Sequence, residues 1–267
     1  MKLTVLTDNT TRIDAYYAGE PGVSYYLEDG DTRILFDAGY SDVYLRNAEK
    51  MGIDLTRVDA IVFSHGHDDH TRGLLYFPET ATTMTVVAHP GVLEPKRCDG
   101  LMIGMPLTQE ELEKRFILKL SREPVQLSEK LTFLGEIPRT VDFEGKEPIG
   151  ERFNGVSWQP DYLLDDSALA YRGEEGLWII AGCSHAGICN IIDYAKKVCG
   201  EERICGVIGG FHLLEITPRV EKTAEYLSKV RPKHLCPCHC TSFHARAAIH
   251  GRVPIEEVCV GDTLVLR

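Results

Sequence analysis

Short apolar runs rich in strand-forming residues dominate the first third of the chain, and the first of them alternates apolar and polar residues. Three such runs are KLTVL, SYYLE and RILFD, at residues 2–6, 24–28 and 33–37. A turn at Asp29-Gly30 separates the last two runs and predicts a hairpin. The stretch SDVYLRNAEKMG, residues 41–52, changes to helical spacing and ends at a glycine. We therefore expect a sheet that begins at the N-terminus and is followed by a helix.

Strands and helices alternate over the rest of the chain. Further apolar runs predict strands at DAIVF, TVVAH, LTFLG, SALAY, LWIIAG, ICGVIGG and TLVLR. GICNIIDYAKKVCG has apolar residues at helical spacing, and Thr217 followed by Pro218 begins another helix that runs to Val230. This order predicts an α/β layered architecture in a single domain over residues 1–267.

Residues 90–122 differ from this pattern. They combine turn residues, a Met-Gly-Met stretch and a charged helical segment. We interpret them as an insertion over one end of the sheet. The insertion is either a surface subdomain or a lid on a substrate pocket, since loops of this length often carry function.

Charge and cysteine content narrow the partners. The chain has 29 Lys and Arg against 40 Asp and Glu, a formal charge of -11, which disfavours nucleic acid and anionic membranes as partners. A local basic pocket could still bind a small anionic molecule. The N-terminus lacks signal-peptide features, no apolar run approaches a membrane span, and nine cysteines fit a reducing compartment. We expect a cytoplasmic protein with a small-molecule substrate, and the sequence specifies no oligomeric state.

The densest chemistry lies in SHGHDDH, residues 64–70, directly after the run DAIVF. Imidazoles this close together would repel one another if protonated, and a divalent cation compensates for the protons they lose. His65 and His67 can bind one ion from a single turn, while Asp69 and His70 point to a second ion. The pattern predicts two divalent metal ions, with Zn²⁺ as the default and iron or manganese as ions that the same ligands accept.

This motif, HxHxDH after an apolar strand and preceded by LFDAG at residues 35–39, resembles the metallo-β-lactamase superfamily. The resemblance implies an α/β fold, a four-layer αββα sandwich, with a binuclear metal site at one edge. It also implies that His65, His67, Asp69 and His70 are metal ligands. Asp37 would support the metal-binding loop from behind.

The superfamily pattern requires ligands later in the chain: a histidine, a bridging carboxylate and a final histidine. Cys183 stands where the bridging Asp is usual, as either a thiolate ligand or a small buried thiol. The later histidine is His89, His185 or another residue, and we favour His185 because it follows the run LWIIAG and precedes a helix. His239 fits the final position. Its neighbours Cys238 and Cys240 are expected to point away from whatever His239 faces.

Other candidates lie near the same sheet edge. His212, at the end of ICGVIGG, is either a seventh ligand, a substrate-contacting acid or a packed histidine. Arg139 follows a strand and a proline and is a candidate contact for an anionic substrate. Lys96 and Arg97 in the insertion are substrate contacts or, alternatively, solvated surface residues.

A narrower resemblance covers nearly the whole chain. GEIPRTVDFE, DDSALAY, GCSHAGICN, GGFHL and CHCT resemble a subgroup labelled 7,8-dihydropterin-6-methyl-4-(β-D-ribofuranosyl)aminobenzene-5'-phosphate synthase, which includes a ferredoxin-like MBL-fold protein. The label is spread over proteins whose chemistry need not be the same.

The expected activity is hydrolysis by a metal-bound hydroxide that attacks an ester-type or phosphoester substrate. Asp69 would orient the hydroxide, and His212 or His185 would lie near the leaving oxygen. One alternative is a transferase that joins a phosphoribosyl donor to a pterin or aminobenzoate precursor. A further alternative is a metal-binding or di-iron redox protein, which is disfavoured because di-iron members usually carry Glu at the position of His67.

Overall fold

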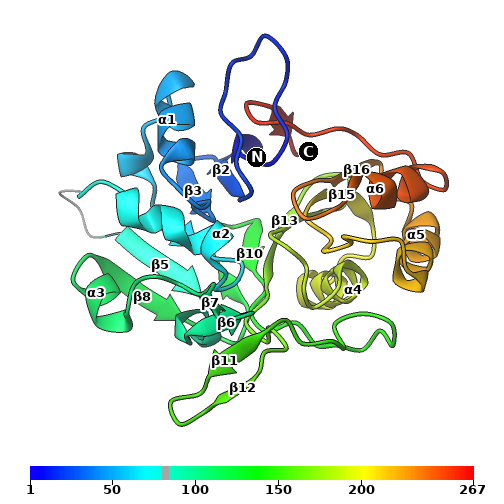
Figure 1. The fold of residues 1–267 in the computed structure, drawn as a ribbon. Coiled ribbons are helices and arrows are strands. Elements are labelled where there is room, and N and C mark those ends of the chain that lie inside the picture. The colour runs from blue at the N-terminus through cyan, green and yellow to red at the C-terminus, as the bar shows by residue number, and fades with distance from the viewer. Residues whose placement is uncertain (80–83) are drawn as a thin grey trace. The chain divides into compact units, whose positions relative to one another are not determined.

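The computed structural model describes residues 1–79 and 84–267, which divide into two compact units (Figure 1). The first unit comprises Met1–Arg122, Pro148–Asp165 and Cys259–Val265. The second unit comprises Glu123–Glu147, Asp166–Val258 and Leu266–Arg267. Because the chain passes from one unit to the other several times, the division does not coincide with any single linker in the sequence.

The first unit contains a seven-stranded sheet in the order β17-β1-β2-β3-β4-β5-β8. Its strands are β1 (Lys2–Thr7), β2 (Ser24–Asp29), β3 (Thr32–Phe36), β4 (Ala60–Val62), β5 (Met84–Ala88), β8 (Phe116–Leu120) and β17 (Thr263–Val265). The predicted hairpin of β2 and β3 is confirmed, and Gly30 adopts a φ of 61° in its turn. From β3 to β8 the strands are parallel, so each is reached by a crossover.

Short helices cover the apolar side of this sheet. They are α1 (Val43–Lys50), η1 (Leu55–Arg57), α2 (Asp68–Thr71), η2 (Arg72–Tyr76), η3 (Pro90–Leu93) and α3 (Gln109–Glu113). The predicted helix after LFDAG is confirmed as α1, whose Tyr44 and Ala48 pack against Leu35 and Ile61 of the strands. Alternate residues of β5, Met84, Val86 and Ala88, face this core, as the geometry of a strand requires.

Residues 90–122 fall into two parts. β6 (Lys96–Cys98) and β7 (Leu101–Met102) join β11 (Glu151–Phe153) and β12 (Trp158–Pro160) in a separate four-stranded sheet, seen low in Figure 1. β8, in contrast, pairs in parallel with β5 at the edge of the main sheet of the first unit. The part of this segment that stands apart from the main sheet is therefore shorter than the predicted insertion.

The second unit contains a six-stranded sheet in the order β16-β15-β14-β13-β10-β9. Its strands are β9 (Val125–Gln126), β10 (Leu131–Phe133), β13 (Ala168–Arg172), β14 (Leu177–Ala181), β15 (Ile204–Gly209) and β16 (His234–Pro237). β14, β15 and β16 are parallel, so their carboxyl ends meet at one edge of the sheet. Loops at such an edge are where α/β proteins commonly place ligands.

Three helices, yellow to orange in Figure 1, belong to this second sheet: α4 (Ile188–Cys199), α5 (Pro218–Val230) and α6 (Phe243–His250). The predictions of α4 and α5 are confirmed. Ile191 of α4, Leu227 of α5 and Ile249 of α6 share one apolar core with Leu177 and Ile179 of β14. In the part of the chain that the structure describes, no helix combines the length and the hydropathy that crossing a membrane requires.

Candidate metal centre

The histidines of SHGHDDH lie where β4 ends and α2 begins. His67 is the residue before the first turn of α2, which carries Asp69 and His70. All three imidazoles are buried, with exposed fractions of 0% for His65 and His70 and 8% for His67. The ring centroid of His65 lies 4.7 Å from that of His67 and 4.3 Å from that of His70. The structure therefore brings the imidazoles of the motif together in one buried cluster.

Asp37, directly after β3, supports this cluster through hydrogen bonds to His70 and Ser64. Its carboxylate accepts from His70 Nδ1 at 2.7 Å and from both the backbone N–H and the hydroxyl of Ser64, each also at 2.7 Å. Asp37 is fully buried and has a φ of 57°, a conformation uncommon for a residue other than glycine. With its Nδ1 proton directed at Asp37, His70 presents Nε2 as the nitrogen that can bind a metal.

A second buried carboxylate supports the loop at Gly66. Asp165 Oδ2 accepts from the Gly66 backbone N–H at 2.8 Å, and its Oδ1 lies 3.0 Å from Lys96 Nζ. Lys96 Nζ also lies 2.9 Å from Asp161 Oδ2. Burial lowers the pKa of Lys96, but the carboxylates of Asp165 and Asp161 outweigh it and raise the pKa above its ordinary value.

Lys96 is therefore neither a solvated residue nor a free contact for substrate, and both predicted roles are wrong. Its side chain is 1% exposed and is held between the two carboxylates. The sequence gives no local sign of this, because Asp161 and Asp165 lie more than 60 residues away. Arg97 lies with its guanidinium 4.1 Å from the ring of Trp158 and pairs with Glu151.

The donors of this cluster fit a divalent cation. Burial lowers the pKa of His67 to about 4, against the opposing charge of Asp69. His67 is therefore neutral near pH 7, and the neutral imidazole is the form that binds a metal. Asp69 Oδ2 lies 3.6 Å from His70 Nε2, so a carboxylate oxygen and an imidazole nitrogen face the same space.

The second unit gathers its own donors at the ends of β14, β15 and β16. Cys183 and His185 follow β14, with exposed fractions of 3% and 6%. His212 follows β15, and its ring centroid lies 4.4 Å from that of His185. The sulfur of Cys183 and a ring nitrogen of His239, after β16, lie within 4.8 Å of each other. Four of the residues predicted from the sequence are thus neighbours at one sheet edge.

The expectation that Cys240 points away from this edge is wrong. Its sulfur and a ring nitrogen of His212 both lie within 4.8 Å of the sulfur of Cys183. Alternation of side chains holds only in an extended strand, and His239 has a φ of 49°, which turns the chain between the two cysteines. Burial raises the pKa of Cys240, but its hydrogen bond with Cys183 and the nearby His239 and His212 lower it well below the ordinary value.

Two further candidates have structural partners. His89 precedes η3, where its Nδ1 accepts from the Gly91 backbone N–H at 3.0 Å. Among the described residues, His89 belongs to none of the groups of side chains that could hold a metal. Arg139 is half-buried, and its Nη1 donates to the carbonyl of Gly145 at 2.6 Å. Its contact with substrate stays a prediction.

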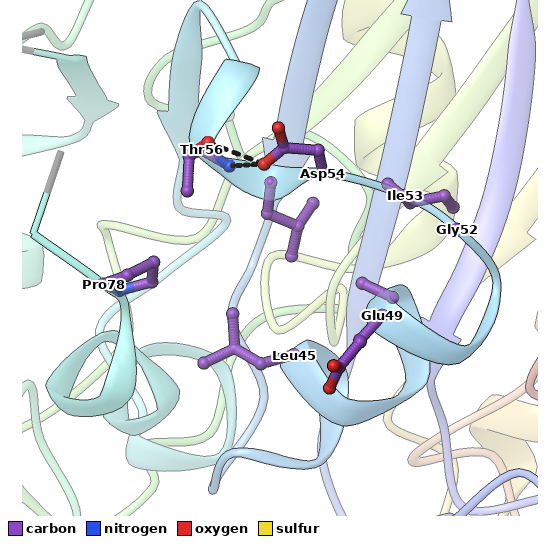
Figure 2. Close-up of a pocket in the computed structure, with 9 residues that line it drawn as sticks. Leu45, Glu49, Gly52, Ile53, Asp54, Thr56 and Pro78 are labelled. Atoms are coloured by element: carbon purple, nitrogen blue, oxygen red, sulfur yellow. Dashed lines mark hydrogen bonds between the residues drawn. The ribbon is translucent and has the colours of Figure 1, made fainter. Parts of the chain in front are cut away.

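A pocket of about 360 Å³ lies beside the C-terminal end of α1 in the first unit (Figure 2). Figure 2 shows Leu45, Glu49, Ile53 and Pro78 around it, and Asp54 bonded to Thr56 at its rim. None of the predicted metal ligands is among the described residues that line it. This pocket is therefore separate from the histidine cluster.

Comparison with known proteins defines the class. Residues 17–194 match the family described as the metallo-beta-lactamase superfamily. The chain therefore belongs to this superfamily and is a metal-dependent enzyme with its fold. The predicted fold class is confirmed.

Three of the similar proteins cover nearly the whole chain. The chain is 32% identical over 264 residues to the "7,8-dihydropterin-6-methyl-4-(beta-D-ribofuranosyl)-aminobenzene-5'-phosphate synthase" of Methanocaldococcus jannaschii, covering 92% of this chain and 89% of that protein. It is 31% identical to Tm1679, a "metal-dependent hydrolase of the beta-lactamase superfamily", whose crystal structure it matches with a TM-score of 0.87 over 100% of this chain and 99% of that one. The metallo-β-lactamase fold protein YhfI of Bacillus subtilis, at 15% identity, covers 98% of both chains with a TM-score of 0.61 and shares the fold.

Proposed function

We propose that the chain is a metal-dependent hydrolase that acts on an ester-type or phosphoester small molecule with two divalent metal ions, Zn²⁺ by preference. One observation carries the proposal: three buried imidazoles lie with ring centroids 4.3 to 4.7 Å apart, and the carboxylate of Asp37 orients one of them. A buried group of imidazoles, one of them oriented by a carboxylate, is the arrangement that metal-binding histidines use.

His65, His67, Asp69 and His70 would hold the ions, and the ligand set that the resemblance implies also includes His185 and His239. When bound, the metal supplies a Lewis acid and lowers the pKa of a water molecule to about 7, which makes a nucleophile available at neutral pH. Because the pKa of His67 is lowered to about 4, its imidazole is neutral near pH 7 and can bind a cation without first losing a proton.

The protein's own groups would position the reaction. Asp37 keeps the proton of His70 on Nδ1, 2.7 Å from its carboxylate. Asp69, a partly exposed carboxylate, would orient the attacking water. His212 or His185 would lie near the leaving oxygen, while Arg139 would pair with an anionic group of the substrate.

The test is hydrolysis of a panel of a phosphodiester, a lactone and a thioester by the full chain. We expect activity on one of these bonds that a chelator removes and that added Zn²⁺ restores. His67→Ala should abolish it, whereas His244→Ala, at an exposed position of α6, should leave it unchanged. Activity that persists in metal-free protein would refute the proposal.

A second candidate function is synthesis of a coupled product from two substrates. It is favoured by the 32% identity to the Methanocaldococcus jannaschii protein that is named a synthase. The reaction would join a phosphoribosyl donor to a pterin or aminobenzoate precursor. Formation of such a product by metal-loaded protein that hydrolyses none of the panel would favour this alternative.

A cytoplasmic location belongs to the same proposal. None of the nine cysteines, all of which lie among the described residues, forms a disulfide, which suits a reducing compartment. Fractionation of the native host's cells would test it, and recovery of the protein from the cytoplasmic fraction is the expected result.

A further inference from the structure

Cys183, His212 and Cys240, which we call the thiol triad, form a group that the proposed hydrolytic mechanism does not use as a unit. Two thiol sulfurs and one ring nitrogen all lie within 4.8 Å of one another. The three residues come from the separate loops that follow β14, β15 and β16. Their proximity is therefore a product of the fold of the second unit and not of a local sequence repeat.

Hydrogen bonds fasten the three loops together. The Gly210 backbone N–H donates to the carbonyl of Gly182 at 2.8 Å, and the Ser184 hydroxyl donates to the carbonyl of Gly210 at 2.6 Å. The Phe211 backbone N–H donates to the hydroxyl of Thr241 at 3.0 Å. Each loop is thus tied to a neighbour within two residues of a triad member, so the donor atoms are held in place before any ligand binds.

The backbone at Gly210 and His212 lies close to the sulfur of Cys240. The His212 backbone N–H donates to this sulfur at 3.3 Å. A Cβ atom at Gly210 would lie 2.5 Å from the same sulfur, so only glycine allows the close approach. Ser184 and His212 have φ values of 57° and 46°, conformations that cost energy and that cluster at functional sites.

We propose that Cys183, His212 and Cys240 bind a thiophilic metal ion, Zn²⁺ by chemical class, in a site with two sulfur ligands and one nitrogen ligand. Two thiolates and an imidazole suit zinc better than magnesium or manganese, which prefer oxygen ligands. Both sulfurs bind as thiolates, so any thiol proton that they still carry is released to solvent and the two negative charges neutralise the dication.

The coordination of this site leaves room for another ligand. Three protein ligands leave one position of a tetrahedral zinc ion unfilled. His212 and Cys240 are both partly exposed, so water or a small molecule can approach from solvent. Because Cys183 also lies within 4.8 Å of His239, its thiolate can be shared with an ion that His239 binds. This site goes beyond the proposed hydrolase, whose predicted ligands are imidazoles and a carboxylate.

Cobalt(II) provides the test, because a thiolate bound to cobalt gives a charge-transfer band in the near ultraviolet that histidine and carboxylate ligands do not give. The full chain would be purified under reducing, oxygen-free conditions, stripped with a chelator and titrated with cobalt(II). We expect a thiolate band in the wild-type protein. Cys240→Ala should reduce the band to about half, because one of two sulfur ligands remains. Cys183→Ala/Cys240→Ala should remove the band.

Cys238→Ala is the matched control, because it removes a buried thiol from the same loop without touching the triad, and its band should equal that of the wild type. X-ray absorption of the zinc-loaded wild-type protein needs no variant to fold, and it should show sulfur at about 2.3 Å from zinc. Cobalt bound with no thiolate band, or a band that Cys240→Ala leaves unchanged, would overturn the triad while leaving the hydrolase proposal intact. Wild-type protein that shows the thiolate band but hydrolyses no substrate would contradict only the hydrolase proposal.

Discussion

The two groups of candidate metal ligands are brought together in different ways. In the first unit, three imidazoles and two carboxylates come from the seven consecutive residues 64–70. In the second unit, the thiol triad is drawn from three loops that span residues 183 to 240. A cluster formed by consecutive residues can be recognised from the sequence. A cluster formed by residues from several loops can be recognised only from the structure.

The contrast is not complete, because the local motif depends on distant residues. Asp37 lies 27 residues before Ser64, and Asp165 lies 99 residues after Gly66, yet both hold the loop through hydrogen bonds of 2.7 and 2.8 Å. The following changes test how far the histidine cluster depends on this support.

Lys96→Met should have the largest effect on stability. It would leave Asp161 and Asp165 buried without their cation, and breaking a buried ion pair in this way costs about 3–5 kcal/mol. Urea unfolding at pH 7 measures the loss. Lys114→Met removes an exposed pair with Glu110 and should change the free energy of unfolding by less than about 1 kcal/mol. Equal effects of the two changes would show that Lys96 does not support the loop.

The stability that the ion pair of Asp165 and Lys96 contributes should decrease at acidic pH. Burial raises the pKa of Asp165, but Lys96 outweighs it, so the folded pKa lies below the ordinary value of 3.8. As the pH falls below that value, the unfolded chain takes up a proton first, and the stability contributed by Asp165 is lost as the pH passes through its folded pKa. The free energy of unfolding in urea should decrease as the pH is lowered from 6 through the folded pKa of Asp165. Asp165→Asn should make this pH dependence weaker. An unchanged decline in the variant would contradict the assignment.

Asp37→Asn tests the support of His70. An amide can donate to Nδ1, which would move the histidine proton to Nε2 and block the metal-binding nitrogen. We expect metal affinity to fall about 10- to 100-fold, as for other residues that orient metal-binding histidines. Competition with a chromophoric chelator measures the affinity. Asp31→Asn, at an exposed position of the hairpin, should leave the affinity unchanged, and similar losses in both variants would contradict the role of Asp37.

Ser242→Ala should have the smallest effect, and it tests whether the N-terminal cap of α6 positions the thiol triad. The Ser242 hydroxyl accepts from the Ala245 backbone N–H at 3.2 Å and caps α6, so its loss costs about 1 kcal/mol. Thermal unfolding measures this cost, with Ser228→Ala on α5 as the comparison that caps no helix. The cobalt–thiolate band should persist in Ser242→Ala, and its loss would mean that the cap, and not the loop hydrogen bonds, positions Cys240.

Apolar patterns in the sequence predicted these strands and helices because each element buries apolar side chains, as α4 does with Ile191 and as the hairpin strands do with Tyr25 and Leu35. They could not predict Lys96, whose partners are set by a long-range approach of β6 to the segment around Asp165. The predicted direction of the Cys240 side chain was also wrong. His239 has a left-handed backbone conformation, which directs the Cys240 side chain toward Cys183, whereas strand alternation would direct it away. Long-range ion pairs and single left-handed residues leave no periodic signal.

We propose that the buried histidine cluster holds the metal ions of a hydrolase. The decisive experiment is elemental analysis of metal per chain, in wild-type protein and in His67→Ala purified without added metal. We expect about two equivalents in the wild type, and in the variant a loss of metal together with a loss of ester or phosphoester hydrolysis. Wild-type protein that holds no metal, or a variant that keeps both its metal and its hydrolytic activity, would contradict it.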